Sequence, residues 1–220
     1  LKGEIYLTQK QTGEAKMAFN KAVGVKPEWP APYRNLAKIA LFEKNHEAAV
    51  AYLKQGFEKT SDPALGVEYA QIQQQAGNNE AAKKVYEAIL EKNPRLTAAR
   101  NNLAMLLTRG EPDKQDLDRA LSLVASFELS ENPILLDSLG WVYFKRNEMG
   151  MAVKTLERAH SLLKEQPTPE ISYHLAEAYV AMERNSEAIK LLKVAVASDS
   201  QFNGKDRAKR LLQELQPESL

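Results

Sequence analysis

The side chains that could perform catalysis are few, and they are scattered along the chain. The three histidines are His46, His160 and His174, and none stands in the HxxxH or HExxH spacing that would indicate a metal site. Asp137 and Ser138 could form a triad with His174, but the helical pattern around them offers no strained nucleophile turn and no oxyanion hole. We therefore interpret these three residues as exposed polar groups. The sequence predicts no enzyme, no metal and no cofactor.

The overall composition is that of a soluble globular protein. Of the 220 residues, 44% are hydrophobic and 27% are charged, and none is cysteine. The net charge of +1 gives no general reason to expect nucleic acid or an anionic membrane as a partner. No apolar run approaches the roughly 20 residues of a membrane span, so we expect no direct membrane insertion. The opening LKGEIYLTQK lacks Met and begins inside a helical pattern, which favours a C-terminal fragment of a longer chain.

The elements that carry these side chains are predicted from small residues that recur at a nearly constant period. One series consists of Gly3, Ala37, Ala70, Ala104, Gly140 and Ala176, at intervals of 34, 33, 34, 36 and 36 residues. A second series consists of Ala15, Ala49, Ala82, Ala120, Ala152 and Ala188. The second series follows the first by 12 residues except in the fourth unit, where the segment 110–116 (GEPDKQD) indicates a longer inter-helix loop. Such a double register indicates six similar helix pairs.

A further regularity supports helix pairing. A large apolar residue follows each alanine of the second series by four, and these residues are Phe19, Leu53, Tyr86, Val124, Leu156 and Leu192. The whole pattern resembles the tetratricopeptide repeat (TPR), a helix–turn–helix unit of about 34 residues with small residues where its two helices cross. The resemblance implies an all-α fold, a right-handed α-solenoid of about six TPR helix–turn–helix repeats plus a C-terminal capping helix.

The resemblance also implies boundaries within a single TPR superhelix over residues 1–220. The expected repeats are 1–29 (truncated at its start), 30–62, 63–96, 97–132, 133–168 and 169–202. The capping helix is expected at about 204–216. Its residues Ala208, Leu211, Leu212 and Leu215 follow the i, i+3, i+4, i+7 spacing that gives a helix one apolar face.

Gly140 and Trp141 are neighbours in the predicted helix DSLGWVYFKRN, residues 137–147. A glycine inside a helix costs about 1 kcal/mol relative to alanine. Because Gly140 belongs to the first small series, we predict that it lies at a helix crossing, where a side chain would force the two helices apart. At about 100° per residue, Trp141 lies near 200° from Leu139, on the side opposite the packed stripe. Trp141 is therefore predicted to face a groove.

The same helical phase applied to the other repeats predicts a peptide-binding groove. Its residues are Arg34, Lys38, Gln71, Asn101, Met105, Asp137, Trp141, Phe144, Tyr173 and Glu177. Aromatic and methionine anchors among polar groups are typical of a binding patch. The alternative is that a tight superhelix buries these side chains against neighbouring helices. A clamp for a peptide's terminal carboxylate, as in some TPR domains, could begin at Arg34, Asn35 and Lys38, but the following helix does not complete it.

Three segments of the C-terminal half resemble a particular group of bacterial TPR proteins. The segments are NNLA at 101–104, DLDRAL at 116–121 and LDSLGW at 136–141. They resemble the TPR-repeat lipoprotein of PEP-CTERM/exosortase systems, which are associated with exopolysaccharide production and protein sorting. The resemblance implies a lipid-anchored precursor, with the anchor upstream of this chain, and a periplasmic or cell-envelope location. The residues themselves leave a cytoplasmic location open.

The leading functional hypothesis is a non-catalytic scaffold that binds a protein or peptide segment in the concave groove, within such an envelope system. The alternative is a substrate-recruiting or regulatory TPR arm of an enzyme whose catalytic domain lies upstream. A third hypothesis is a purely architectural homo-oligomer. The sequence determines neither the partner's identity nor the oligomeric state.

Overall fold

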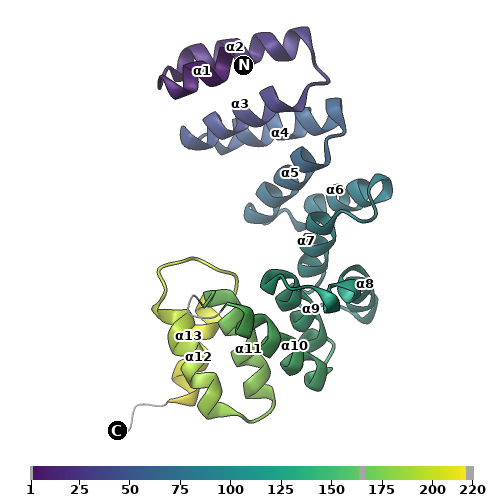
Figure 1. Ribbon diagram of the computed structural model, residues 1–220, viewed down its shortest axis with the longest axis vertical. Coiled ribbons are helices and arrows are strands. Elements are labelled where there is room, and N and C mark those ends of the chain that lie inside the picture. Colours follow the sequence, from purple (N-terminus) through teal and green to yellow (C-terminus); the bar gives the residue numbers. More distant parts are fainter. Residues whose placement is uncertain (1, 164–166, 217–220) are drawn as a thin grey trace. The chain divides into compact units, whose positions relative to one another are not determined.

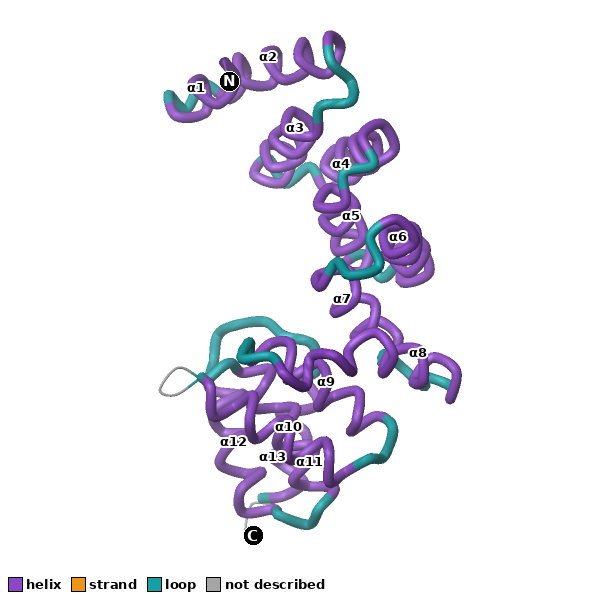
Figure 2. Tube along the Cα trace, turned by 45° about the vertical axis from the view of Figure 1, so that its right-hand side comes forward, coloured by secondary structure: helices purple, strands orange, loops and turns teal. Residues whose placement is uncertain are grey.

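Every regular element in the described part of the chain is a helix. The computed structural model describes residues 2–163 and 167–216 (Figure 1), and Figure 2 shows helices joined by loops throughout those ranges. The predicted all-α fold class is confirmed. Within the same ranges, none of the helices combines the length and the apolar character needed to cross a bilayer. Leu1, the predicted entry into the first helix, and Pro217, after the last one, lie outside the described residues.

The chain divides into two compact units, Leu1–Arg100 and Asn101–Leu220. The helices of the first unit are α1 (Lys2–Thr8), α2 (Thr12–Val25), α3 (Pro30–Phe42), α4 (His46–Thr60), α5 (Pro63–Gln75) and α6 (Asn79–Lys92). Helix α7 (Thr97–Leu107) begins in the first unit and ends in the second. The helices of the second unit are α8 (Lys114–Val124), the 3₁₀ helix η1 (Ala125–Leu129), α9 (Pro133–Lys145), α10 (Met149–Leu162), α11 (Pro169–Ala181), α12 (Asn185–Ala197) and α13 (Lys205–Leu215). The repeat boundaries drawn from the sequence remain predictions.

Prolines and short polar side chains determine where many of these helices begin. Pro30, Pro63, Pro133 and Pro169 each occupy the first position of a helix, where the missing backbone N–H is not needed. The Asn45 side chain caps α4 by accepting a hydrogen bond from the Ala48 amide at 3.0 Å. The sequence therefore encodes these helix starts locally.

The two small-residue series are buried, and the two glycines among them lie at helix crossings, as predicted. All twelve residues of the two series are buried. A Cβ atom at Gly140 would lie 2.6 Å from the Leu156 Cγ, and one at Gly3 would lie 2.6 Å from the Phe19 Cε1. Phe19 and Leu156 are the large residues that follow Ala15 and Ala152 by four. The predicted role of Gly140 at a crossing, here between α9 and α10, is thus confirmed.

The insertion in the fourth unit falls close to its predicted place. The loop between α7 and α8 spans residues 108–113, and Lys114 already begins α8, so the predicted loop 110–116 is displaced by two to three residues. The Asp113 side chain explains this start because it accepts a hydrogen bond from the Asp116 amide at 2.8 Å. The 3₁₀ helix η1, which directly follows α8, was not expected from the sequence.

The core of the second unit continues to its last helix. Leu156, Leu175, Leu192 and Ala195 belong to one buried cluster that also contains Ala208 and Leu211 of α13. Leu212 and Leu215 pack against the same cluster from its edge. Since α13 has a single apolar face, it packs on the preceding helices with that face and leaves its charged residues outside.

Candidate functional site

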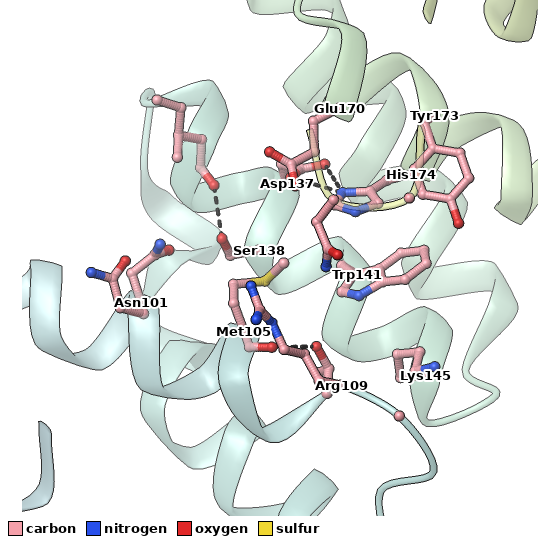
Figure 3. Close-up of a pocket in the computed structure, with 16 residues that line it drawn as sticks. Asn101, Met105, Arg109, Asp137, Ser138, Trp141, Lys145, Glu170, Tyr173 and His174 are labelled. Atoms are coloured by element: carbon pink, nitrogen blue, oxygen red, sulfur yellow. Dashed lines mark hydrogen bonds and ion pairs between the residues drawn. The ribbon is translucent and has the colours of Figure 1, made fainter. Parts of the chain in front are cut away.

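The second unit contains a cavity of about 480 Å³, drawn in Figure 3. Its walls come from α7, α9 and α11, from the loop after α7 and from the loop between α12 and α13. The lining residues are Asn101, Asn102, Met105, Thr108, Arg109, Gly110, Ile134, Asp137, Ser138, Trp141, Lys145, Glu170, Tyr173, His174, Asn203 and Gly204. A cavity of this size matches a side chain or a short segment of a ligand.

Five of the predicted groove residues come together in this cavity: Asn101, Met105, Asp137, Trp141 and Tyr173. The other two predicted residues of the second unit, Phe144 and Glu177, do not line it. Phe144 lies behind Trp141, with the two rings stacked at a centroid distance of 4.9 Å. Glu177 accepts a hydrogen bond from the Tyr173 hydroxyl at 2.9 Å. Phe144 and Glu177 therefore contact residues of the cavity wall without lining the cavity themselves.

Trp141 is both a wall of the cavity and part of the packed interior. Its ring stacks on the His174 ring with centroids 4.1 Å apart and an interplanar angle of 21°. It also packs against the buried cluster of the second unit. The helical wheel placed Trp141 opposite its own repeat's stripe, and the neighbouring helix α11 fills part of the space on that side. Trp141 therefore both lines the cavity and packs in the core of the second unit.

Asp137 and His174 form a buried pair at one end of the cavity. The His174 Nδ1 lies 2.9 Å from Oδ1 and 3.0 Å from Oδ2 of Asp137, and the two residues are 2% and 5% exposed. Burial lowers the pKa of His174, but the charge and hydrogen bond of Asp137, together with Glu170 and Glu177, outweigh it, so the pKa is raised. The pair joins α9 to α11.

The interpretation of Asp137, Ser138 and His174 as exposed polar groups is wrong, because all three are buried. The sequence shows that these three residues have the side chains of a catalytic triad. It does not show that neighbouring helices bury them. The Ser138 hydroxyl nevertheless donates its hydrogen bond to the Ile134 carbonyl at 3.1 Å, within its own helix. The two groups that pair are Asp137 and His174, and Ser138 is bonded elsewhere.

The closure of the cavity depends on the loop before α13. Gly204 adopts φ +100°, a left-handed conformation that favours glycine, and a Cβ there would lie 2.3 Å from the Tyr173 Cε1. Tyr173 is buried, and burial raises the pKa of its hydroxyl. Gly204 thus allows the loop to pass directly over the Tyr173 ring. No periodic pattern in the sequence indicated that this loop lines the site.

Two acceptor groups in the cavity have no partner among the described residues. The Asn101 Oδ1 is buried and accepts no hydrogen bond there. The Glu170 carboxylate, in the first turn of α11, is partly buried and forms no hydrogen bond or salt bridge within residues 2–163 and 167–216. Burial raises the pKa of Glu170 and outweighs the opposing charge of His174; Asp137 adds to the rise, and Arg109 opposes it. Buried acceptors without donors carry a free-energy cost that a ligand can relieve.

Glu170, His174, Arg109 and Lys145 line the cavity but were missing from the predicted groove. Glu170 and His174 lie three residues before and one residue after Tyr173, outside the narrow arc of α11 that the helical phase selected. Arg109 belongs to the loop after α7, and loop residues follow no helical period. The sequence signal that could have found Glu170 is its position in the first turn of a helix.

The other three predicted groove residues, Arg34, Lys38 and Gln71, belong to the first unit and are not among the residues that line this cavity. Arg34 is engaged, with its Nε 2.8 Å from Glu68 and its Nη2 3.2 Å from Asp62. Lys38 and Gln71 are exposed. Because the Arg34 guanidinium already pairs with two carboxylates, it is not a free cation for a peptide's terminal carboxylate.

Comparison with known proteins identifies repeats in two segments of the chain and a known fold. Models of the tetratricopeptide repeat match residues 1–28 and 70–133. Among solved structures, a thermophilic TPR protein of Thermus thermophilus is 23% identical with a TM-score of 0.65, covering 84% of this chain and 99% of that chain. YrrB, described as a TPR protein with an unusual peptide-binding site, is 17% identical with a TM-score of 0.59, covering 88% of this chain and 98% of its own.

A third solved structure is PilW, described as a widely conserved type IV pilus biogenesis factor. It is 11% identical with a TM-score of 0.66, and 94% of each chain is covered. At these identities the likeness shows the fold, which is that of a TPR solenoid. No curated protein matches the chain in sequence.

Proposed function

We propose that this chain, which carries tetratricopeptide repeats at residues 1–28 and 70–133 on the fold of a TPR solenoid, is a non-catalytic scaffold that binds a peptide segment in the cavity of its second unit. The observation that carries the proposal is the cavity itself. It places an apolar wall beside an acceptor, the Asn101 Oδ1, that has no partner among the described residues. An extended peptide offers apolar side chains and backbone N–H donors, which match both features.

The apolar wall consists of Met105 on α7 and Trp141 on α9. Methionine adapts its shape to different side chains, and a tryptophan held by neighbouring rings loses little entropy on binding. The stack of Trp141 on His174 and Phe144 holds the indole in place before any ligand arrives. We therefore place an apolar side chain of the bound segment against Met105 and Trp141, with a backbone N–H donating to Asn101.

The test is a selection of random heptapeptides, displayed without free termini, on the whole chain and on the variant Met105→Gln. The wild type should enrich peptides that contain Leu, Ile, Phe or Met. Met105→Gln keeps the length of the side chain but makes it polar, and should weaken the best peptide about tenfold or more, which corresponds to a loss of at least ~1.4 kcal/mol. Affinities are measured by fluorescence polarisation of the synthesised peptide.

The matched control is Met182→Gln, because Met182 is 48% exposed at the end of α11 and does not line the cavity. It should bind as the wild type does. If no peptide is enriched, or if both variants lose affinity equally, the assignment of the cavity as a peptide site is wrong.

We further propose that the chain acts in a bacterial cell envelope, in an exosortase-type system that couples exopolysaccharide production with protein sorting. The resemblance of NNLA, DLDRAL and LDSLGW supports this proposal. Two of these segments supply Asn101, Asp137 and Trp141 to the cavity, so the residues that carry the resemblance are also the residues expected to bind. Protease treatment of intact spheroplasts that express the full-length protein tests the location. The repeats should be digested, and protection inside the cytoplasm would contradict the proposal.

A further inference from the structure

Glu170 is the one carboxylate of the cavity wall without a partner among the described residues. The other, Asp137, is held by the His174 Nδ1 at 2.9 Å and 3.0 Å. Figure 3 shows Glu170 beside this pair. The first turn of α11 supplies some stabilisation to the Glu170 charge through the helix dipole. Burial and the proximity of Asp137 nevertheless raise the pKa of Glu170, which means that its negative charge is under-compensated.

The cationic groups of the cavity compensate the Glu170 charge only in part: the charges of His174 and Arg109 lower the Glu170 pKa, and His174 is already paired with Asp137. Arg109 is exposed, and the Lys145 Nζ lies 5.8 Å from the Trp141 ring centroid. Within the described ranges neither of them forms a salt bridge with Glu170. An exposed cation is satisfied by water, whereas a partly buried carboxylate lacks full hydration and gains more from a counter-ion. The incomplete hydration of Glu170 therefore favours a positively charged ligand group beside it.

The surroundings of Glu170 match a basic side chain rather than a bare cation. Met105 and Trp141 offer apolar surface on which the methylene stem of arginine or lysine can pack. The Asn101 Oδ1, on α7, is a separate acceptor without a partner among the described residues, and a backbone N–H of the same segment can donate to it. Two acceptors on different helices thus call for two donors, one charged and one from a peptide backbone.

We infer that the segment bound in the cavity carries an arginine or lysine whose cation pairs with the Glu170 carboxylate, next to the apolar residue that packs on Met105 and Trp141. This inference rests on the proposed peptide-binding function and adds the charge of the ligand to it. Residue 170 is accordingly the position that determines which charge is selected.

The experiment repeats the heptapeptide selection on the wild type, Glu170→Gln and Glu170→Lys. The wild type should enrich Arg or Lys, Glu170→Gln should enrich neither charge, and Glu170→Lys should enrich Asp or Glu. The best wild-type peptide is then synthesised with its basic residue replaced by citrulline or glutamine, which keeps the shape and removes the charge. This replacement should weaken binding to the wild type at least about tenfold and leave binding to Glu170→Gln unchanged within about twofold.

Three controls keep the outcomes distinct. Glu131→Gln removes an exposed carboxylate just before α9 and should bind as the wild type does. Thermal melting of Glu170→Gln should show no loss of stability, since the substitution removes a partly buried charge without a partner among the described residues. Butylguanidinium, which carries a guanidinium on an alkyl chain and no second donor group, should bind at least about tenfold more weakly than the peptide, because it leaves Asn101 without a donor.

Enrichment of apolar peptides with no preference for Arg or Lys would overturn this inference and leave the peptide-binding function standing. Enrichment of nothing would overturn both. Butylguanidinium that binds as tightly as the peptide would mean that the cavity is a site for small cations, which also overturns the inference.

Discussion

At the scale of single residues, the buried Asp137–His174 pair makes the stability of the second unit depend on pH. In the folded protein the pKa of His174 is raised above its ordinary value of 6.5, because the surrounding acidic groups outweigh the effect of burial. Protonated His174 therefore stabilises the fold fully below about pH 6.5, and this contribution is lost as the pH rises through the folded-state pKa. The charged groups that raise the His174 pKa are Asp137, Glu170 and Glu177.

We predict that the free energy of unfolding falls as the pH is raised above about 6.5, and that this fall is absent in His174→Gln. Urea unfolding followed by circular dichroism at a series of pH values checks this. Burial lowers the pKa of His160 from 6.5. Its contribution to the free energy of unfolding therefore changes below pH 6.5, and it increases as the pH rises. Burial is the main cause that raises the pKa of the Tyr179 hydroxyl to about 12. This hydroxyl affects stability only above the ordinary tyrosine value of 10.

The raised pKa of Glu170 also makes the free energy of unfolding fall as the pH rises, but this fall begins at the ordinary glutamate value of 4.5. The difference between wild type and His174→Gln isolates the histidine. An identical pH dependence in the two proteins would show that the pair contributes nothing to stability in this range.

At the scale of the helical elements, the contact of α9 with α10 depends on the absence of a side chain at Gly140. Leu156 is fully buried, so it cannot move away from an added Cβ without displacing its own neighbours. We predict that Gly140→Ala destabilises the protein by about 1–3 kcal/mol through overpacking, although alanine is the better helix former. Thermal or chemical unfolding measures this change.

Gly150, in the first turn of α10, is the matched control. A Cβ at Gly150 would meet no atom within 4 Å. Gly150→Ala should therefore be neutral or stabilising by up to about 1 kcal/mol. If the two substitutions changed stability in the same direction and by the same amount, close packing at the α9–α10 crossing would not be the reason for Gly140.

At the scale of the whole molecule, the last helix completes the core of the second unit. Ala208 and Leu211 are buried in the same cluster as Leu192 and Ala195 of α12. The loop that leads into α13 also closes the cavity, because Asn203 and Gly204 are among its lining residues. The same C-terminal segment therefore contributes both to the core and to the wall of the cavity.

We predict that deleting residues 204–220 lowers the melting temperature of the second unit or causes aggregation, because an apolar face of α12 becomes exposed. The same deletion should weaken peptide binding, since it removes Gly204 from the cavity wall and the helix that holds the loop in place. Calorimetry and light scattering measure the first effect. A truncated chain that remains soluble, monodisperse and equally stable would show that α13 does not act as a cap.

The sequence by itself determined the repeating helix pairs and the positions where they touch. Small residues at 12-residue offsets, with a large apolar residue four positions later, specify local packing that repeats along the chain, and short-range periodicity records such packing directly. Gly140 could be assigned to a crossing for this reason. Five of the cavity residues, including Met105 and Trp141, were also predicted, because they share one helical phase.

Only the tertiary structure decided which polar side chains meet and which are enclosed. Asp137 and His174 lie 37 residues apart in the sequence, and their pairing depends on how α11 packs on α9, which no local pattern encodes. Their burial could not be predicted either, since exposure depends on what covers a helix face rather than on the residue type. The same holds for Glu170 and Gly204. A cavity wall built from a helix start and a loop arises when distant segments pack together, and it leaves no periodic signal in the sequence.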